Sequence, residues 1–186
     1  MHRKITRLRG WQRAERLWLL SIALHRRGHP QLANCVKKLN TLVYHNFLPV
    51  EADVSPDIRF GHHGFGIMIH GSVVIGRRVK IFHNVTLTVI PQPSVPAKLI
   101  VEDGVTIGAG AVVVAPVGRT LRIGRGARIG AGAVLSEDVP PGATVVSQPP
   151  RVLMHRSERR LERVSSLEDQ PLRPPAGRQR RRRARR

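Results

Sequence analysis

A six-residue repeat constrains the fold of this chain more than any other feature of its sequence. Aliphatic residues recur at that spacing, and a small or β-branched residue follows most of them by four positions. The aliphatic positions of the clearest run are Ile69, Ile75, Ile81 and Leu87. An amphipathic helix has a period of about 3.6 residues and a half-buried strand a period of two, so neither explains the pattern.

A repeat of six residues is typical of a parallel β-helix, in which each hexad forms one short strand and one tight corner. Three hexads complete a triangular coil, and the aliphatic side chains of successive coils stack inside it. Glycine often follows the aliphatic residue, as at Gly76, and tolerates corner angles that a Cβ atom disfavours. The sequence therefore predicts a mainly β fold, with a parallel β-helix over residues 50–153.

Two helices are predicted ahead of the β-helix, within an N-terminal helical segment at residues 1–49. The first runs from about residue 11 to 27, with an apolar stripe formed by Trp11, Ala14, Trp18 and Ile22. The second runs from about residue 31 to 47, with a stripe formed by Leu32, Val36, Leu39 and Val43. We interpret the pair as a cap on the β-helix or an oligomerisation element.

Two segments interrupt the repeat. Residues 88–98 contain three prolines and are predicted to form an extruded loop. Residues 119–122 are interpreted as a short insertion that follows a hexad with Val113 and Val117 at its interior positions. Beyond the β-helix we predict a short C-terminal helix at residues 154–170 and a disordered, arginine-rich tail at residues 171–186.

The charge of the chain is concentrated at its two ends. The formal net charge is +20, and residues 1–38 carry ten Lys or Arg against one acid, whereas residues 171–186 carry eight arginines and no acid. A nucleic-acid-binding protein places its basic charge on the folded surface, often with interleaved aromatic residues, so we expect no specific nucleic-acid partner. Weak contacts of the basic termini with an acidic partner or a membrane surface remain open.

The sequence favours a cytoplasmic protein. The apolar stretch at residues 17–24 is too short to span a bilayer and is not followed by a cleavage region typical of a signal peptide. The single cysteine, Cys35, cannot form an intramolecular disulfide, which is typical of a reducing compartment. We expect its thiol to be buried.

Four histidines lie near the start of the repeat and are candidates for chemistry. His62 and His63 precede the regular hexads in a glycine-flanked stretch, where a side chain can leave the lattice. His70 takes the second place of its hexad and His83 the third place, so each is either a surface residue of a corner or a substrate contact.

The stretch His62-His63-Gly64-Phe65-Gly66-Ile67-Met68-Ile69, together with VVIG-RRVKIFHNVTL and the closing DVPPGATVV, resembles the bacterial serine acetyltransferases and their exopolysaccharide-cluster relatives. The resemblance covers roughly residues 50–153 and implies a left-handed β-helix and acetyl transfer from acetyl-CoA, without a metal. It implies a homotrimer and a hydroxyl acceptor, either serine, as in cysteine biosynthesis, or a saccharide such as an exopolysaccharide.

The same resemblance implies roles for individual residues. His63 matches the general base that takes the proton of the acceptor hydroxyl, while the family's preceding aspartate is His62 here. We expect His62, His83 and Asn84 to contact the acceptor. Three further residues are expected to bind acetyl-CoA: Ala131, Ser136 and Arg151.

Two other readings of the sequence predict different functions. Gamma-type carbonic anhydrases use the same β-helix and bind zinc through three histidines, but the sequence has no histidine between His83 and His155. The second alternative is a non-enzymatic scaffold that docks on acidic partners through its basic tail. Loss of acetyl-CoA turnover on removal of His63 would distinguish the enzyme from both.

Overall fold

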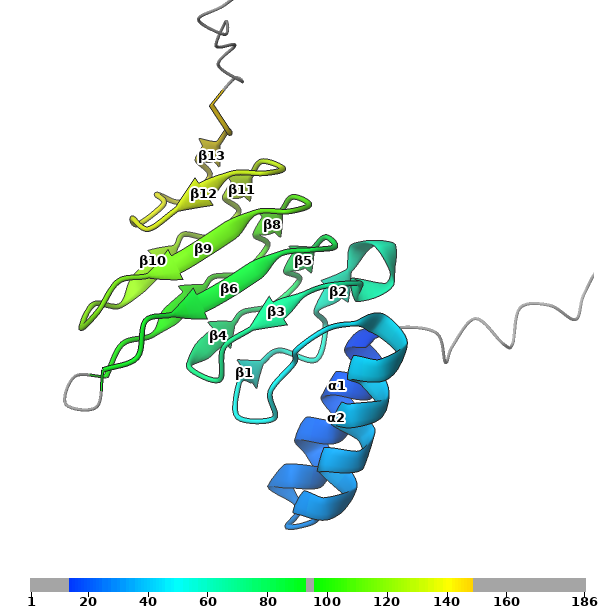
Figure 1. Ribbon diagram of the computed structural model, residues 1–186. Coiled ribbons are helices and arrows are strands. Elements are labelled where there is room, and N and C mark those ends of the chain that lie inside the picture. Colours follow the sequence, from blue (N-terminus) through cyan, green and yellow to red (C-terminus); the bar gives the residue numbers. More distant parts are fainter. Residues whose placement is uncertain (1–13, 93–95, 149–186) are drawn as a thin grey trace, which may run out of the picture. The chain divides into compact units, whose positions relative to one another are not determined.

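The computed structural model describes residues 14–92 and 96–148 of the 186-residue chain. Within them, two helices precede a stack of short parallel strands that wind as a β-helix (Figure 1). The predicted fold class is confirmed. The predicted helix at 154–170, the tail at 171–186 and the expected cofactor residue Arg151 lie outside the described residues.

The first helix, α1 (Ala14–Arg26), packs against the second, α2 (Pro30–Tyr44). Gly28 separates them with a φ of +80°, a left-handed conformation that glycine adopts without strain, and proline opens α2, where its missing N–H costs nothing. The predicted α1 stripe is confirmed for Ala14, Trp18 and Ile22, which are buried. Neither described helix has the length and apolar character needed to cross a membrane.

The predicted buried face of α2 is wrong. Leu32, Leu39 and Val43 are about half exposed, and the buried positions are instead Ala33, Asn40 and Tyr44. One of these positions is buried through a polar contact that a hydrophobic stripe cannot reveal, since the amide of Asn40 donates to the carbonyl of Ala14 at 3.0 Å.

Cys35 is exposed on α2, contrary to the expectation that its thiol is buried.

The strands form three parallel sheets, one on each side of the coil (Figure 1). Sheet B contains β1 (Asp53–Val54), β4 (Val73–Ile75), β7 (Leu99–Val101) and β10 (Leu121–Ile123). Sheet C contains β2 (Arg59–Phe60), β5 (Lys80–Ile81), β8 (Thr106–Ile107), β11 (Arg128–Ile129) and β13 (Thr144–Val145). Sheet A contains β3 (Met68–Ile69), β6 (Thr86–Val89), β9 (Val112–Ala115) and β12 (Val134–Leu135).

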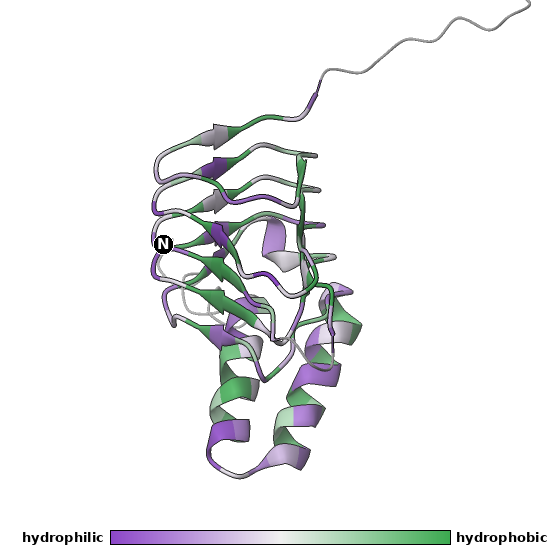
Figure 2. Ribbon diagram, turned by 90° about the vertical axis from the view of Figure 1, so that its left-hand side faces the viewer, coloured by the Kyte–Doolittle hydropathy of each residue, from purple (hydrophilic) through white to green (hydrophobic). Residues whose placement is uncertain are grey.

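The interior of the β-helix is a stack of aliphatic side chains in strict register. Ile81 pairs with Ile107, and Ile107 with Ile129, so one hexad position repeats from coil to coil. All three are at most 2% exposed. Figure 2 shows the corresponding green, hydrophobic segments in successive strands. The interior positions predicted from the repeat are therefore confirmed for this run of coils.

Two predicted interruptions begin or end elsewhere than expected. β6 continues to Val89, which is buried and pairs with Ala115, so the proline-rich excursion leaves the coil after Val89 rather than at residue 88. Val117 is 49% exposed, whereas Leu121 is fully buried in β10. The chain therefore leaves the lattice at the turn after Ala115 and returns at Leu121, inside the segment expected to be an insertion.

Two of the three outer faces of the β-helix, those of sheets C and A, differ in chemistry. Successive partners on sheet C are mostly basic: Arg59, Lys80, Thr106 and Arg128. Successive partners on sheet A are mostly apolar: Phe47, Met68, Thr86, Val112 and Val134. Side chains alternate between interior and exterior along a strand, so the residue before each interior aliphatic residue determines the character of its face.

Carboxylates stabilise the corners between sheets B and C. Asp57 accepts hydrogen bonds from the backbone N–H of Arg78 at 3.0 Å and from the hydroxyl of Ser55 at 2.7 Å. These bonds, led by the one from Arg78, lower the pKa of the Asp57 carboxyl below its ordinary value. Arg78 itself has a φ of +55°, so Asp57 holds the neighbouring coil in a left-handed turn.

Replacing Leu121 and Val117 separately by alanine will test the revised path of the chain. We expect Leu121→Ala to lower the free energy of unfolding by about 2–5 kcal/mol, because it leaves a cavity in a packed interior. Val117→Ala, at an exposed site, is expected to change it by about 0.5 kcal/mol or less. Urea denaturation followed by circular dichroism measures both, and equal losses would contradict the assignment.

Candidate functional site

Most of the predicted site residues lie along one edge of the β-helix, where the chain passes from sheet C to sheet A. The histidine turn (Gly61–Gly64) forms this corner in the first coil, between β2 and β3. His83 and Asn84 form it in the next coil, and Ala131 forms it after β11. Backbone hydrogen bonds link these corners, from Asn84 N–H to the Phe65 carbonyl at 2.8 Å and from Gly110 N–H to the His83 carbonyl at 3.0 Å.

The histidine turn has a strained backbone. His62 has a φ of +49° and His63 a φ of +62°, so two consecutive side-chain-bearing residues adopt the left-handed conformation. Such conformations cost about 1–3 kcal/mol each and persist when surrounding contacts impose them, which is frequent at functional sites. Both side chains are exposed, so the turn presents two imidazoles to solvent.

Close aromatic packing imposes this conformation. A Cβ atom at Gly61 would lie 2.5 Å from the ring of Phe82, and one at Gly64 would lie 2.6 Å from the ring of Phe60. The turn therefore lies on two rings, and glycine is required at both of its ends. Phe60 in turn stacks on Trp18 of α1, with ring centroids 5.9 Å apart.

The helical segment thus positions the histidine turn. The indole N–H of Trp18 donates to the carbonyl of Pro49 at 2.7 Å, which joins α1 to the start of the β-helix. A Cβ atom at Gly64 would also come within 3.0 Å of the Ala14 side chain, so the first residue of α1 lies directly against the turn. The interpretation of the helices as a cap is supported, with the cap covering one end of the site.

His62 is held by a second histidine from the neighbouring coil. The Nδ1 atoms of His62 and His83 lie 2.6 Å apart, which is a hydrogen bond in which one nitrogen carries the proton and the other accepts it. The His62 ring also meets Phe82 edge to face, at 5.7 Å between centroids. The structure therefore brings together two of the residues predicted to contact the acceptor.

Asn84 lies at the same corner, where it is exposed and its amide lies against the backbone of Gly66. Its φ is +55°, a left-handed conformation for which asparagine is well suited. A Cβ atom at Gly66 would clash with its Oδ1 atom, so its amide occupies the space that glycine leaves. Asn84 thereby shapes the corner beside His83, and a role in contacting the acceptor stays a prediction.

A cavity of about 410 Å³ opens beside the histidine turn. Its lining comes from β2, β5 and the turn, and consists of Arg59, Phe60, His62, His63 and Lys80. Arg59 and Lys80 were not predicted as site residues from the sequence. Each directly precedes the first residue of a hexad. Because the residue before an interior position faces outward, this pattern could have identified both.

His70 lies on a different corner, where the chain leaves sheet A for sheet B. Its Nδ1 accepts a hydrogen bond from the backbone N–H of Ser72 at 3.1 Å. The ring thus satisfies a backbone donor in a tight turn. Of the two roles that the sequence left open for His70, the structure supports the structural one.

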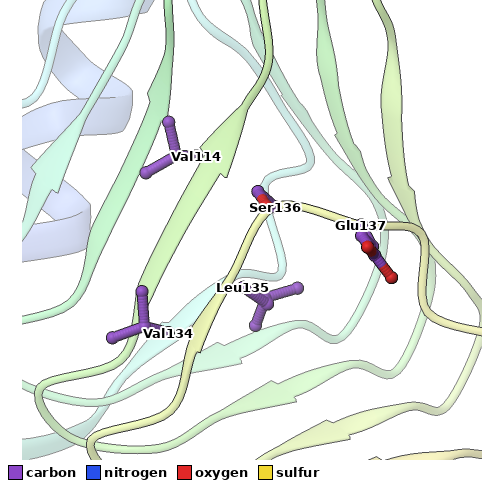
Figure 3. Close-up of a pocket in the computed structure, with 5 residues that line it drawn as sticks. All are labelled: Val114, Val134, Leu135, Ser136 and Glu137. Carbon is purple, nitrogen blue, oxygen red and sulfur yellow. The ribbon is translucent and has the colours of Figure 1, made fainter.

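The predicted cofactor residues Ala131 and Ser136 lie in the last described coils. Ala131 is exposed at the same edge as the histidines, about 10 Å from His83 if two strand spacings separate their coils. Ser136 lines a second cavity of about 330 Å³ at the end of sheet A, together with Val114, Val134, Leu135 and Glu137 (Figure 3). The two residues therefore lie at opposite ends of β12.

The described residues contain no group of three or more His, Cys, Asp or Glu side chains placed to hold a metal ion. The contact between His62 and His83 also has the wrong geometry for two ligands of one zinc ion. Tetrahedral ligands about 2.0–2.1 Å from the metal lie about 3.3 Å apart, whereas these nitrogens share a proton at 2.6 Å. The donor arrangement does not favour the carbonic anhydrase alternative.

Solved structures of serine acetyltransferases share this architecture. The soybean serine acetyltransferase apoenzyme superposes with a TM-score of 0.64 at 31% identity, over 75% of this chain and 56% of that one. The chain resembles the serine acetyltransferases. Serine acetyltransferase from Brucella abortus strain S19 in complex with coenzyme A superposes with a TM-score of 0.64 at 25% identity, over 74% of this chain and 53% of that one. The family resemblance predicted from the sequence motifs is confirmed.

A curated relative extends the likeness to an N-acetyltransferase. The 2,3,4,5-tetrahydropyridine-2,6-dicarboxylate N-acetyltransferase of Staphylococcus aureus (strain JH9) is 36% identical over 83 residues, which are 45% of this chain. The matched region spans 33% of that relative, and the superposed serine acetyltransferases are matched over little more than half of their length. No family model matches the chain.

Adding one methyl group at Gly64 will test how tightly the histidine turn is held. Gly64 has a φ of +74° and Gly126 one of +69°, so alanine at either position incurs a similar left-handed strain of about 1–2 kcal/mol. At Gly64 the new Cβ also clashes with Phe60, whereas at Gly126 it meets no described heavy atom within 4 Å. We expect Gly64→Ala to be the more destabilising variant by about 1–3 kcal/mol in urea denaturation. Equal losses would show that the contacts around the turn are loose.

Proposed function

We propose that this chain is an acetyl-CoA-dependent O-acetyltransferase of the serine acetyltransferase type, with His63 as the general base. The acceptor is a compound with a hydroxyl group, such as serine or a saccharide. The observation that carries the proposal is the exposed, strained histidine turn, at the corner where this chain's motif matches that of the serine acetyltransferases.

The chemistry requires a base because a hydroxyl group with a pKa far above 7 is a poor nucleophile. The imidazole of His63 takes the hydroxyl proton as the acceptor oxygen bonds to the carbonyl carbon of the thioester. The tetrahedral intermediate then collapses with cleavage of the carbon–sulfur bond, and His63 returns the proton to the departing thiolate. The products are the acetyl ester and CoA.

The partner of His62 explains how this site works without the family's aspartate. His62 occupies that position, and its hydrogen bond to His83 ties the ring to the neighbouring coil. We infer that the His62–His83 pair keeps the turn in the conformation that presents His63. Because this hydrogen bond joins two corners of neighbouring coils, the orientation of the His63 imidazole depends on how the coils stack.

The acetyl-CoA side of the proposal rests on the edge that continues beyond the histidines. The corners after β8 and β11 consist of small residues, Ala109-Gly110 and Ala131-Gly132, so an extended pantetheine arm meets no bulky side chain there. The coenzyme A complex of the Brucella abortus enzyme supports this ligand. Ala131, Ser136 and Arg151 stay the predicted contacts.

A homotrimer would complete this arrangement. Sheet A exposes an apolar column that reaches from Phe47 to Val134, and Val134 is 74% exposed. A surface of this kind on a folded protein marks an interaction site. Packing sheet A of one subunit beside the histidine edge of another would form a groove between them, as the family resemblance implies.

Replacing His63 by alanine is the direct test of the base. We expect the release of free CoA from acetyl-CoA in the presence of an accepted hydroxyl compound to fall by about 10²- to 10⁴-fold. A panel containing L-serine, neutral sugars and anionic sugars, monitored with a thiol reagent, would also identify the acceptor. His25→Ala, an exposed histidine in the last turn of α1, is the matched control and should retain wild-type turnover. Unchanged turnover in folded His63→Ala protein would refute the assignment.

Introducing a charge on sheet A will test the assembly. We expect Val134→Glu to shift the protein from trimer to monomer in light scattering, because a buried unpaired carboxylate opposes association. Val117→Glu places the same charge on an exposed valine in the turn after β9 and should leave the trimer intact. A wild-type protein that is monomeric at micromolar concentration would contradict the proposed trimer.

A further inference from the structure

The cavity beside the histidine turn is electropositive, and its lining bears on the chemical class of the acceptor. This inference rests on the proposed function, since it concerns the molecule that His63 would deprotonate. Of the five lining residues, one is an arginine, one is a lysine and two are histidines, and none is a carboxylate. The cavity volume of about 410 Å³ is within the range of small-molecule sites.

The two cations face the cavity as a directly opposed pair. Arg59 of β2 and Lys80 of β5 are register partners on neighbouring parallel strands, about 4.8 Å apart across the sheet. Like charges in this relation repel each other. Among the described residues, no carboxylate forms an ion pair with either of them. An anion held between the two side chains would remove the repulsion.

Lys80 is held close to the histidines by an aromatic ring. Its ammonium nitrogen lies 4.6 Å from the centroid of the Phe82 ring, and the same ring meets His62 edge to face. The positive charge of this exposed side chain thus lies beside the turn that carries His63. A ligand group bound by Lys80 would lie within the reach of a small molecule from the proposed base.

This electrostatic setting disfavours a cationic group on the acceptor. An ammonium group bound in the cavity needs a carboxylate partner, but the position of the family's aspartate is taken by His62, and Arg59 and Lys80 add positive charge. Carboxylate and phosphate groups match both cations, since a guanidinium binds them with two parallel hydrogen bonds and an ammonium binds them as a point charge.

We propose that Arg59 and Lys80 form an anion-binding subsite, and that the hydroxyl acceptor carries a carboxylate or a phosphate but no ammonium group, as acidic or phosphorylated sugars do. The subsite holds the anionic group while the hydroxyl of the same molecule lies at His63. Phe60, which also lines the cavity, supplies apolar surface for the sugar ring. Lys80 and Arg59 are specificity-determining residues, and acetyl transfer itself remains the task of His63.

The chain offers a matched control for this subsite. Arg128 lies on the same outward column of sheet C as Lys80, two strands further along, and is exposed, but it does not line the cavity. Neutralising Arg128 removes the same charge from the same face of the β-helix. A local subsite will respond to Lys80→Gln and not to Arg128→Gln, whereas a general electrostatic attraction will respond to both.

The test combines binding and turnover. Calorimetry at low salt would measure binding of glucose 6-phosphate, glucuronate, glucose and L-serine to the full-length protein and to its Arg59→Gln, Lys80→Gln and Arg128→Gln variants. We expect one or both anionic sugars to bind, and Lys80→Gln and Arg59→Gln to weaken that binding by about 10- to 100-fold, the loss typical of a hydrogen bond to a charged group. Arg128→Gln should bind like the wild type. If only one of the two anionic sugars binds, the result shows whether the subsite prefers a phosphate or a carboxylate group.

Turnover assays separate a failure of this inference from a failure of the proposed function. CoA release that is faster with an anionic sugar than with glucose or serine, and that loses this preference in Lys80→Gln, supports the subsite. Equal or better turnover of glucose or L-serine overturns it while leaving acetyl transfer intact. Equal effects of Lys80→Gln and Arg128→Gln also overturn it. Anion binding that depends on Lys80, without CoA release for any acceptor, supports the subsite and refutes the acetyltransferase.

Discussion

The rest of the structure depends on the vertical stacking of aliphatic side chains inside the coil. Each interior residue contacts its equivalents above and below, as Ile107 contacts Ile81 and Ile129, and the parallel hydrogen bonds fix that register. A coil therefore cannot absorb an extra residue within a strand without turning every following side chain to the wrong face. Additional residues must leave at a corner, and the corners become the places where the chain can carry chemistry.

The histidine turn is the clearest consequence of this constraint. Phe60 and Ile69 lie nine residues apart, three more than the six that separate Ile69 from Ile75, and the surplus lies in the turn that carries His62 and His63. The left-handed strain of those residues is opposed by contacts on several sides: the Phe82 ring against Gly61, the Phe60 ring against Gly64, and α1 against both Phe60 and Gly64. The helices and the neighbouring coil thereby hold a conformation that the turn would not adopt alone.

What could be predicted from the sequence follows the same division between interior and corner. The interior positions of the main run and the three sheets were predictable because stacking enforces a period that is visible in one dimension. The buried face of α2 was not predictable, since Asn40 is buried through a hydrogen bond to Ala14, a contact that no hydrophobic pattern records.

The predicted path of the chain near Leu121 was wrong because both Val117 and Leu121 are suitable interior residues. Only the pairing of Leu121 with Leu99 shows which of the two is inside the coil. His62, His63 and His83 were identified as candidates from the sequence. The contact between His62 and His83, and the cations beside them, could not be predicted because they depend on which corners stack on each other.

The separation of interior from corner also explains how such a scaffold changes its acceptor without changing its fold. The side chains of Arg59, His62 and Lys80 point away from the aliphatic stack, so exchanging their charges leaves the packing of Ile58, Val79 and Ile81 untouched. An aspartate at position 62 would place a negative charge beside Lys80, and the cavity would then suit a zwitterion. With histidine there, hydrogen-bonded to His83, the same cavity has an excess of positive charge. The sign of the potential at the acceptor site is therefore set by a few corner and strand-surface residues.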